Sequence, residues 1–366
     1  MTRDVGSISP AQDQFIGVMM VVLTLVGWTS IPLFLRHFAS QIDPWTSNGW
    51  RYGFAALIWC PVLILGAARK RLPEGLWRKA AWPAVVNSIG QVFFTSAFYH
   101  VDSTMAAFGL RSNIICAAIG AAIFFAAERR ILASPPFLIG MVMVLAGTGG
   151  TLVLDDGFAQ GSSPLGILFA VLAGAFYAAY ALAVRMCMKG IPTLVSFAAI
   201  SLYTAGVMIV LMLALGERMG ATAIDLAPTQ FVLLLVSSFV GIAMGHVTYY
   251  MSIARLGVTV SSGVIQLQPF TVAVASIPIE GKFLSGPQWA LGTVAVAGTL
   301  VMLVVQNRMS RRLRAEMAAS GAPTPAHEAE LGVEPGGAVA DDAVAAASEA
   351  ERDAGQPDSP APAPSR

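Results

Sequence analysis

Charged residues are scarce in this sequence. Asp, Glu, Lys and Arg make up 12% of its 366 residues, whereas hydrophobic residues make up 56% and the mean hydropathy is +0.69. Soluble domains carry about 25% charged residues, so this composition excludes an ordinary soluble domain and indicates a polytopic membrane protein. The formal net charge is only +1 and the charges form no basic face, so nucleic acid is not an expected partner.

Cysteine is also rare. The three cysteines, Cys60, Cys116 and Cys187, lie within or at the ends of apolar runs and have neither disulfide nor metal-ligand spacing. We therefore expect no metal and no cofactor. The apolar runs also lack HExxH, Ser-His and clustered-carboxylate arrangements, so we expect a protein that is not an enzyme, with an intramembrane enzyme as a distant alternative.

Long apolar runs are what the sequence has in abundance. A membrane-spanning helix needs a window of roughly 20 predominantly apolar residues. Such windows predict an all-α polytopic membrane protein with ten transmembrane helices, at residues 14–36, 45–67, 82–100, 104–127, 134–154, 164–187, 194–215, 229–253, 258–278 and 287–306.

Basic residues are distributed unequally between alternate loops. A cytoplasmic N-terminus puts fifteen Lys and Arg residues on the inner side and four on the outer side, the four being Arg36, Arg51, Arg218 and Lys282. This asymmetry predicts a multi-pass protein of the cell (inner) membrane with both termini in the cytoplasm. Residues 307–366 are rich in Ala, Pro, Gly and acidic residues, which predicts a disordered cytoplasmic tail, with a segment that binds a protein partner as the alternative.

One motif occurs twice and divides the chain. The pattern E-x6-P-x4-G begins at Glu128 and again at Glu280. We predict an N-terminal segment at 1–13, a five-helix repeat at 14–154, a linker at 155–163 and a second five-helix repeat at 164–306. Because five is an odd number, the second repeat enters the membrane in the opposite direction. Inverted repeats are typical of secondary transporters, which bind substrate near the midplane of the membrane.

The register between the two repeats is not constant. Gly90 and Gly245, on the third and eighth predicted helices, align at an offset of 155 residues, whereas the two E-x6-P-x4-G motifs differ by 152. Arg111 therefore corresponds either to Gln266 or to Gly263 in the second repeat.

These features together resemble the drug/metabolite transporter superfamily, EamA type. The resemblance covers residues 14–306 and is carried by the two five-helix halves, by the Glu before each Pro- and Gly-bearing fifth helix, by Trp28-Thr29-Ser30 and by Arg51. It implies alternating access along a pathway lined by helices 1, 3, 4, 6, 8 and 9 of the ten. Most bacterial members are regarded as exporters of amino acids, metabolites or drugs, and some as importers of vitamins and nucleosides.

One charged residue lies well inside an apolar run. Arg111 sits about two turns into the fourth predicted helix, where a charge is costly in lipid unless it faces protein or water. Its permanently charged fork could bind a substrate carboxylate through two hydrogen bonds. The alternatives are a pairing with Asp102 at the start of the helix and the capping of carbonyl groups of a neighbouring helix.

Other polar and aromatic side chains are candidates to face the same pathway. His246 shares a helical face with two tyrosines, and it is either a protonation switch or a hydrogen-bonded structural residue. Together with Arg111, the predicted substrate-binding residues are Trp28, Asn87, Gln91, Tyr177, Tyr180, His246, Tyr249, Tyr250, Gln266 and Gln268, and Trp28 corresponds to Tyr177 in the repeat.

Acidic residues are confined to helix ends and loops between Phe15 and Gln306. We assign Glu128 and Glu280 mainly to structure, and proton antiport built on a mid-membrane carboxylate is not supported. The sequence predicts a secondary transporter, embedded in the lipid bilayer, that moves a small amphipathic metabolite such as an amino acid or a related carboxylate. Export is favoured, and the alternative is an importer of a vitamin, nucleoside or nucleotide-like compound.

Overall fold

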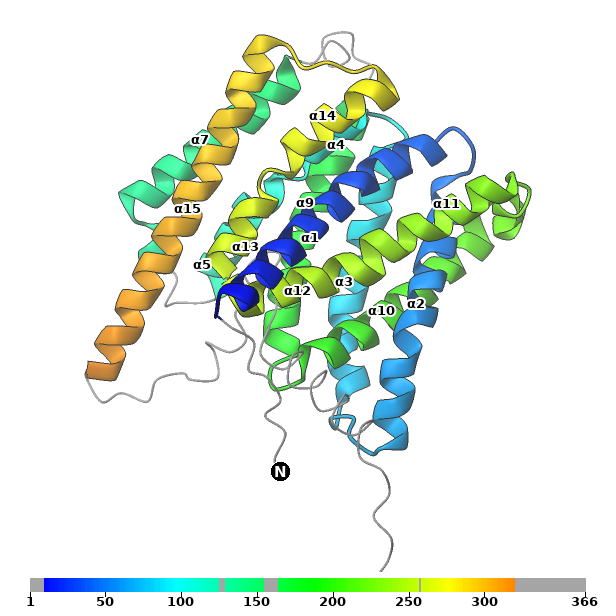
Figure 1. Ribbon diagram of the computed structural model, residues 1–366, viewed down its shortest axis with the longest axis horizontal. Helices are drawn as coiled ribbons and strands as arrows, with labels where there is room; N and C mark the ends of the chain where they lie inside the picture. Colours follow the sequence, from blue (N-terminus) through cyan, green and yellow to red (C-terminus); the bar gives the residue numbers. More distant parts are fainter. Residues whose placement is uncertain (1–9, 125–128, 155–163, 257, 320–366) are drawn as a thin grey trace, which may run out of the picture.

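The computed structural model describes residues 10–124, 129–154, 164–256 and 258–319, which form a bundle of tilted helices (Figure 1). Every regular element in these ranges is helical. The first half contains α1 (Pro10–Phe38), α2 (Pro44–Ala68), α3 (Leu76–Ala97), α4 (Ser103–Gly109), α5 (Ser112–Phe124), α6 (Arg129–Leu132) and α7 (Pro135–Val153). The second half contains α9 (Pro164–Cys187), α10 (Thr193–Leu215), the 3-10 segment η2 (Glu217–Ala223), α11 (Pro228–Ser238), the π-helical segment η3 (Phe239–Met244), α12 (Gly245–Leu256), α13 (Val258–Ile265), α14 (Gln268–Glu280) and α15 (Gly286–Ala319).

Nine helical stretches in the described ranges are long and apolar enough to cross a membrane. The one predicted transmembrane helix that is not among these nine is α3, the third in chain order. Its 22 residues cover about 33 Å at 1.5 Å per residue and so match the hydrocarbon core. Helix α3 is less apolar than the others because it carries several polar side chains, and these form hydrogen bonds to neighbouring helices. Asn87 donates to Thr204 Oγ1 on α10 at 3.0 Å, and Thr95 donates to Asn48 Oδ1 on α2 at 2.6 Å. The fold is therefore all-α, with ten transmembrane helices.

The helices pack as an inverted repeat requires. Helix α3 packs on α9 and its counterpart α12 packs on α1, while α2 packs on α10 and α7 on α15. A Cβ atom on Gly90 would lie 3.1 Å from the ring of Tyr177, and one on Gly245 would lie 2.5 Å from the indole of Trp28. Because both glycines correspond in the repeat, as do both aromatic residues, the two halves make the same close contact twice.

Several helix boundaries differ from the predicted ones. Helix α1 already begins at Pro10, and α3 begins at Leu76 rather than at residue 82, because both helices extend a turn or more beyond their apolar segments. Helix α15 continues past residue 306 to Ala319, since this stretch is rich in Arg, Ala, Leu, Glu and Met, which are strong helix formers. Glu128 and residues 320–366 of the predicted tail lie outside the described ranges.

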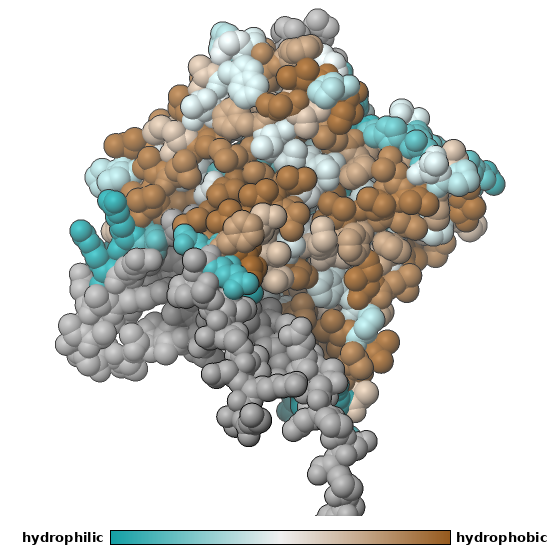
Figure 2. Space-filling model, viewed as in Figure 1, coloured by the Kyte–Doolittle hydropathy of each residue, from teal (hydrophilic) through white to brown (hydrophobic). Residues whose placement is uncertain are grey.

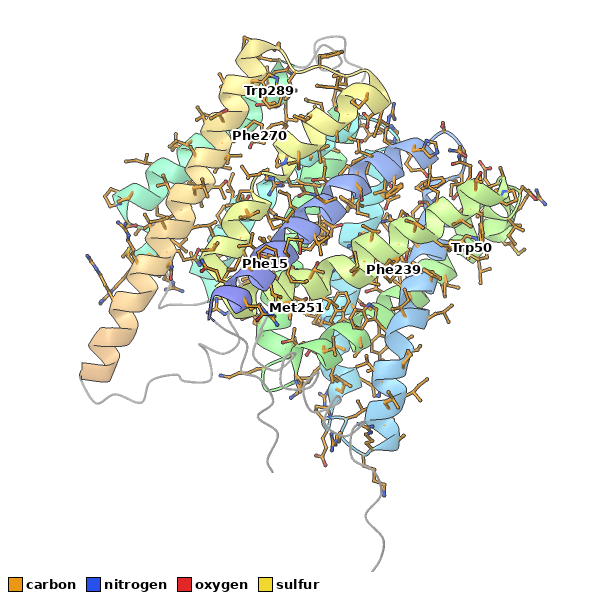
Figure 3. All side chains as sticks on the ribbon, in the orientation of Figure 1. Phe15, Trp50, Phe239, Met251, Phe270 and Trp289 are labelled. Atoms are coloured by element: carbon orange, nitrogen blue, oxygen red, sulfur yellow. The ribbon has the colours of Figure 1, made fainter. Side chains whose placement is uncertain are left out.

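The outer surface is suited to lipid. Large apolar side chains are exposed on the long helices, for example Phe15 on α1, Leu57 on α2 and Val210 on α10. Figure 2 shows hydrophobic residues over the middle of the visible face and hydrophilic residues at the corner formed by η2 and the start of α11. Between helices, Phe270 of α14 and Trp289 of α15 stack with ring centroids 5.4 Å apart (Figure 3).

Candidate functional site

Two of the ten transmembrane helices are broken near their middle. The first break separates α4 from α5 at Leu110 and Arg111, and the second separates α13 from α14 at Gln266 and Leu267. The breaks occupy equivalent positions in the two repeats, so Arg111 lies within one residue of the counterpart of Gln266. Gly263 is excluded as its counterpart because it lies inside α13. Broken helices near the midplane leave backbone groups that a binding site can use.

The two breaks are joined through Arg111. Its Nη1 donates to Gln266 Oε1 at 2.8 Å, and its Nη2 donates to Gln268 Oε1 at 3.0 Å. Arg111 is only 9% exposed, and its Nε is buried without an acceptor among the described residues. Both glutamine side chains are neutral, so they orient the guanidinium but do not neutralise its charge.

Asp102 does not pair with Arg111. One of its oxygens accepts from the Met105 amide at 2.9 Å and caps the start of α4, and the other lies 3.3 Å from Lys282 Nζ. The sequence-based alternative of an Arg111–Asp102 pair is therefore wrong. The hydrogen bonds of Arg111 go to side-chain amides and not to helix carbonyl groups, so the capping alternative is wrong as well.

Arg111 lines a cavity of about 280 Å³ in the interior of the bundle. Nine of the eleven predicted substrate-binding residues line this cavity: Trp28, Asn87, Gln91, Arg111, Tyr177, Tyr180, His246, Tyr250 and Gln268. They come from α1, α3, α9, α12, α14 and the α4–α5 break. Among the described lining residues there is no Asp, Glu or Lys, so positive charge in the cavity is not offset by a carboxylate.

The other two predicted residues lie behind the wall. Tyr249 is almost fully buried, its hydroxyl lies 2.9 Å from Ser262 Oγ, and its ring packs against Trp28 at a centroid distance of 5.1 Å. Gln266 is also buried and holds Arg111. Both therefore support residues of the cavity wall and do not themselves face the cavity.

The polar part of the wall is held in place by a chain of hydrogen bonds. Tyr177 donates its hydroxyl to Gln91 Oε1 at 2.9 Å, and Gln91 Nε2 lies 3.4 Å from Asn87 Oδ1. On the opposite wall, Gln268 Nε2 donates to the carbonyl oxygen of Trp28 at 2.8 Å. These bonds fix the orientation of the side chains before a ligand arrives, which reduces the cost of binding.

Arg51 is a buried charged residue of the cavity that the predicted set lacked. It lies on α2, is only 3% exposed, lines the cavity, and donates from Nε to Ser237 Oγ at 3.1 Å. It was counted among the basic residues of the outer side, although it falls inside the predicted helix at 45–67. The rule that singled out Arg111, a charge within an apolar run, would also have found Arg51. The cavity further includes Tyr52, Phe94 and Asn113. Asn113 is another polar residue within an apolar run, whereas Tyr52 and Phe94 carry no comparable signal in the sequence.

Residues 15–153 and 164–304 each match the EamA-like transporter family. The chain belongs to the EamA-like transporter family. It is therefore a membrane transporter of small molecules, and the family's members are transporters, not enzymes. No curated protein matched the chain. A solved structure titled only "Crystal structure of protein" is similar in fold, with a TM-score of 0.53 and 18% identity over 82% of this chain and 99% of that chain.

His246 of this EamA-like transporter is enclosed by aromatic rings. Its ring centroid lies 4.7 Å from that of Phe197 and 5.5 Å from that of Trp28. Its Nδ1 lies 3.1 Å from the carbonyl oxygen of Ile242. Since a carbonyl can only accept, Nδ1 carries a proton in this contact. No carboxylate among the described cavity residues is placed to pair with an imidazolium, so the geometry favours the structural interpretation of His246.

Replacing His246 with Gln should leave the pH dependence of transport unchanged. Glutamine retains an amide donor for the Ile242 carbonyl, and the ring has no acidic partner that would make its protonation part of the cycle. The test is the transport rate in proteoliposomes between about pH 5.5 and 8.5, the range in which histidine titrates. A profile that becomes flat in the variant would instead identify His246 as the protonation switch.

Glu280 joins the ends of the two broken helices of this EamA-like transporter. Its Oε2 accepts from the amide of Ser103 at 3.1 Å, at the first residue of α4. Nearby, the hydroxyl groups of Thr104 and Ser276 are 3.0 Å apart. A carboxylate at a helix N-terminus is stabilising, and Glu280 does not line the cavity. These contacts are those of a structural residue.

Proposed function

We propose that this EamA-like transporter exports a small amphipathic carboxylate, an amino acid or a related compound, by alternating access across the cell (inner) membrane. The observation that carries the proposal is the position of Arg111. Its guanidinium lies where the two broken helices meet, it lines the cavity, and its Nε has no acceptor among the described residues.

The chemistry of the cavity supports a carboxylate. An arginine that is buried without a counter-charge is costly, and an anion that forms charge-assisted hydrogen bonds to it recovers much of that cost. Aromatic side chains of Trp28, Phe94, Tyr177 and Tyr180 make much of the rest of the wall. Such walls accommodate an apolar or aromatic body, which makes the proposed substrate amphipathic.

For a substrate with a net negative charge, the membrane potential favours export. With an interior-negative membrane potential, each negative charge that leaves the cell gains about 2.3 kcal/mol per 100 mV. An exported anion therefore needs no coupling proton. Consistent with this, each Asp and Glu in the described part of Phe15–Gln306 lies at a helix end or in a loop.

A comparison of metabolites tests substrate and direction together. Cells that express the full chain should show one or more carboxylates depleted inside and enriched in the medium, relative to cells that carry an empty vector. Cells that express Arg111→Ala at equal membrane levels are the matched control and should resemble the empty vector. Accumulation inside the cells would contradict export, and a change confined to cationic or neutral compounds would contradict a carboxylate substrate.

A further inference from the structure

The cavity contains two buried arginines. Arg51 is 3% exposed and Arg111 is 9% exposed. The one hydrogen bond described for the Arg51 guanidinium is that from Nε to Ser237 Oγ at 3.1 Å, so its two terminal nitrogens have no acceptor among the described residues. Arg111 Nε is likewise without an acceptor in the described ranges. Donors of two permanent charges are therefore available to one ligand.

The two arginines come from different segments of the chain. Arg51 lies on α2, whereas Arg111 lies at the break between α4 and α5. Two guanidinium groups from separate segments of the chain therefore line one cavity, where a ligand with two separate acidic groups would pair with both.

Building on the carboxylate proposed above, we infer that the substrate is a small dicarboxylate with an apolar body. A monocarboxylate would leave one buried guanidinium without a counter-charge. An amino acid would bring one carboxylate but also an ammonium group, for which the described cavity wall has no carboxylate partner. A dicarboxylate neutralises both arginines, and buried charges are tolerated best when they are paired and hydrogen-bonded.

Asn113 does not alter this balance. Its Oδ1 is buried without a donor among the described residues and lines the same cavity. A neutral amide oxygen accepts from a hydroxyl group as readily as from an amine, and it adds no negative charge to offset two guanidinium groups. It would therefore accept from a hydroxyl group on the apolar body of the dicarboxylate.

A matched series of probes separates the charge types. The full chain in detergent is titrated with 3-phenylpropionate, phenylalanine, benzylsuccinate and phenyl phosphate, and binding is followed by thermal stabilisation. The first three share a benzyl group and a carboxylate, and they carry on the carbon between these groups a hydrogen, an ammonium group or a carboxymethyl group that supplies the second carboxylate. We expect half-saturation by benzylsuccinate at a concentration at least about tenfold lower than by 3-phenylpropionate, and the weakest binding for phenylalanine.

Variants of Arg51 show whether the second carboxylate is bound there. Arg51→Gln should abolish the advantage of benzylsuccinate over 3-phenylpropionate, and Arg51→Lys should retain part of it because the charge remains without the fork. Arg69→Gln, at an exposed position directly after the end of α2, is the control and should keep the full ratio. If Arg51→Gln does not fold, the wild-type series and Arg51→Lys still decide the question.

The outcomes distinguish this inference from the proposed function. Equal binding of 3-phenylpropionate and benzylsuccinate would overturn the dicarboxylate but leave a carboxylate transporter. Tighter binding of phenyl phosphate than of benzylsuccinate would contradict the dicarboxylate and indicate a substrate with one doubly charged acidic group. If phenylalanine bound most tightly, the substrate would be an amino acid and not a dicarboxylate. If no carboxylate bound, both the dicarboxylate inference and the proposed function would be overturned.

Discussion

Replacing Arg111 with Ala should abolish transport while the protein still inserts into the membrane. Truncating one member of a buried charge pair costs about 2–5 kcal/mol, so the affinity for an anionic substrate should fall by at least about 30-fold. The loss is expected to be large because Arg111 has no basic neighbour in sequence that could replace it and its position is fixed by Gln266 and Gln268 at 2.8 and 3.0 Å. The measurement is the flux of the identified substrate in proteoliposomes.

Two further variants distinguish binding from folding at this position. Arg111→Lys keeps the charge but loses the planar fork, so it should retain weak transport. Gln266→Ala removes one of the two groups that orient the guanidinium without removing charge, and should raise the KM more than it lowers the maximal flux. Normal flux through Arg111→Ala, in protein that elutes as a single species, would contradict a substrate-binding role for Arg111.

The sequence was informative about helices and their duplication for a simple physical reason. A bilayer demands about 20 apolar residues per helix, and a duplicated gene leaves the same spacing of Glu, Pro and Gly in both halves. Nine of the eleven predicted substrate-binding residues line the cavity, because a polar side chain inside an apolar run must face protein or water. Their role in binding remains a prediction.

The sequence could not predict the exact positions of the helix breaks or which face of each helix points toward the cavity. Tyr249 and Tyr250 are neighbours, yet Tyr250 lines the cavity and Tyr249 packs behind Trp28, a difference of one helical position. The register shift of three residues between the repeats left two possible counterparts of Arg111, and nothing in the sequence indicated that Arg111 donates a hydrogen bond to Gln266. The sequence does signal Arg51, because it lies inside the predicted helix at 45–67, but a count of basic residues by loop treats it as a residue of the outer side.

Replacing Gly147 with Ala should destabilise the protein by separating α7 from α15. A Cβ atom at this position would lie 2.5 Å from both the Ala295 nitrogen and the Leu291 carbonyl oxygen. Both are backbone atoms, so the clash cannot be relieved by a side-chain rotation, and overpacking of this kind costs about 1–3 kcal/mol. Gly140 and Gly298 make similarly close approaches to each other's backbone, as is typical of positions where helices pack closely.

Gly149, two residues further along α7, provides the matched control because a Cβ atom there would meet nothing within 4 Å. Alanine is favoured over glycine within a helix by about 1 kcal/mol, so Gly149→Ala should raise the unfolding temperature of the purified protein while Gly147→Ala lowers it. The same chemical change thus has opposite signs at two positions of one helix. If both variants unfolded at the same temperature, close backbone packing of α7 on α15 would not be a source of stability, and the glycines would need another explanation.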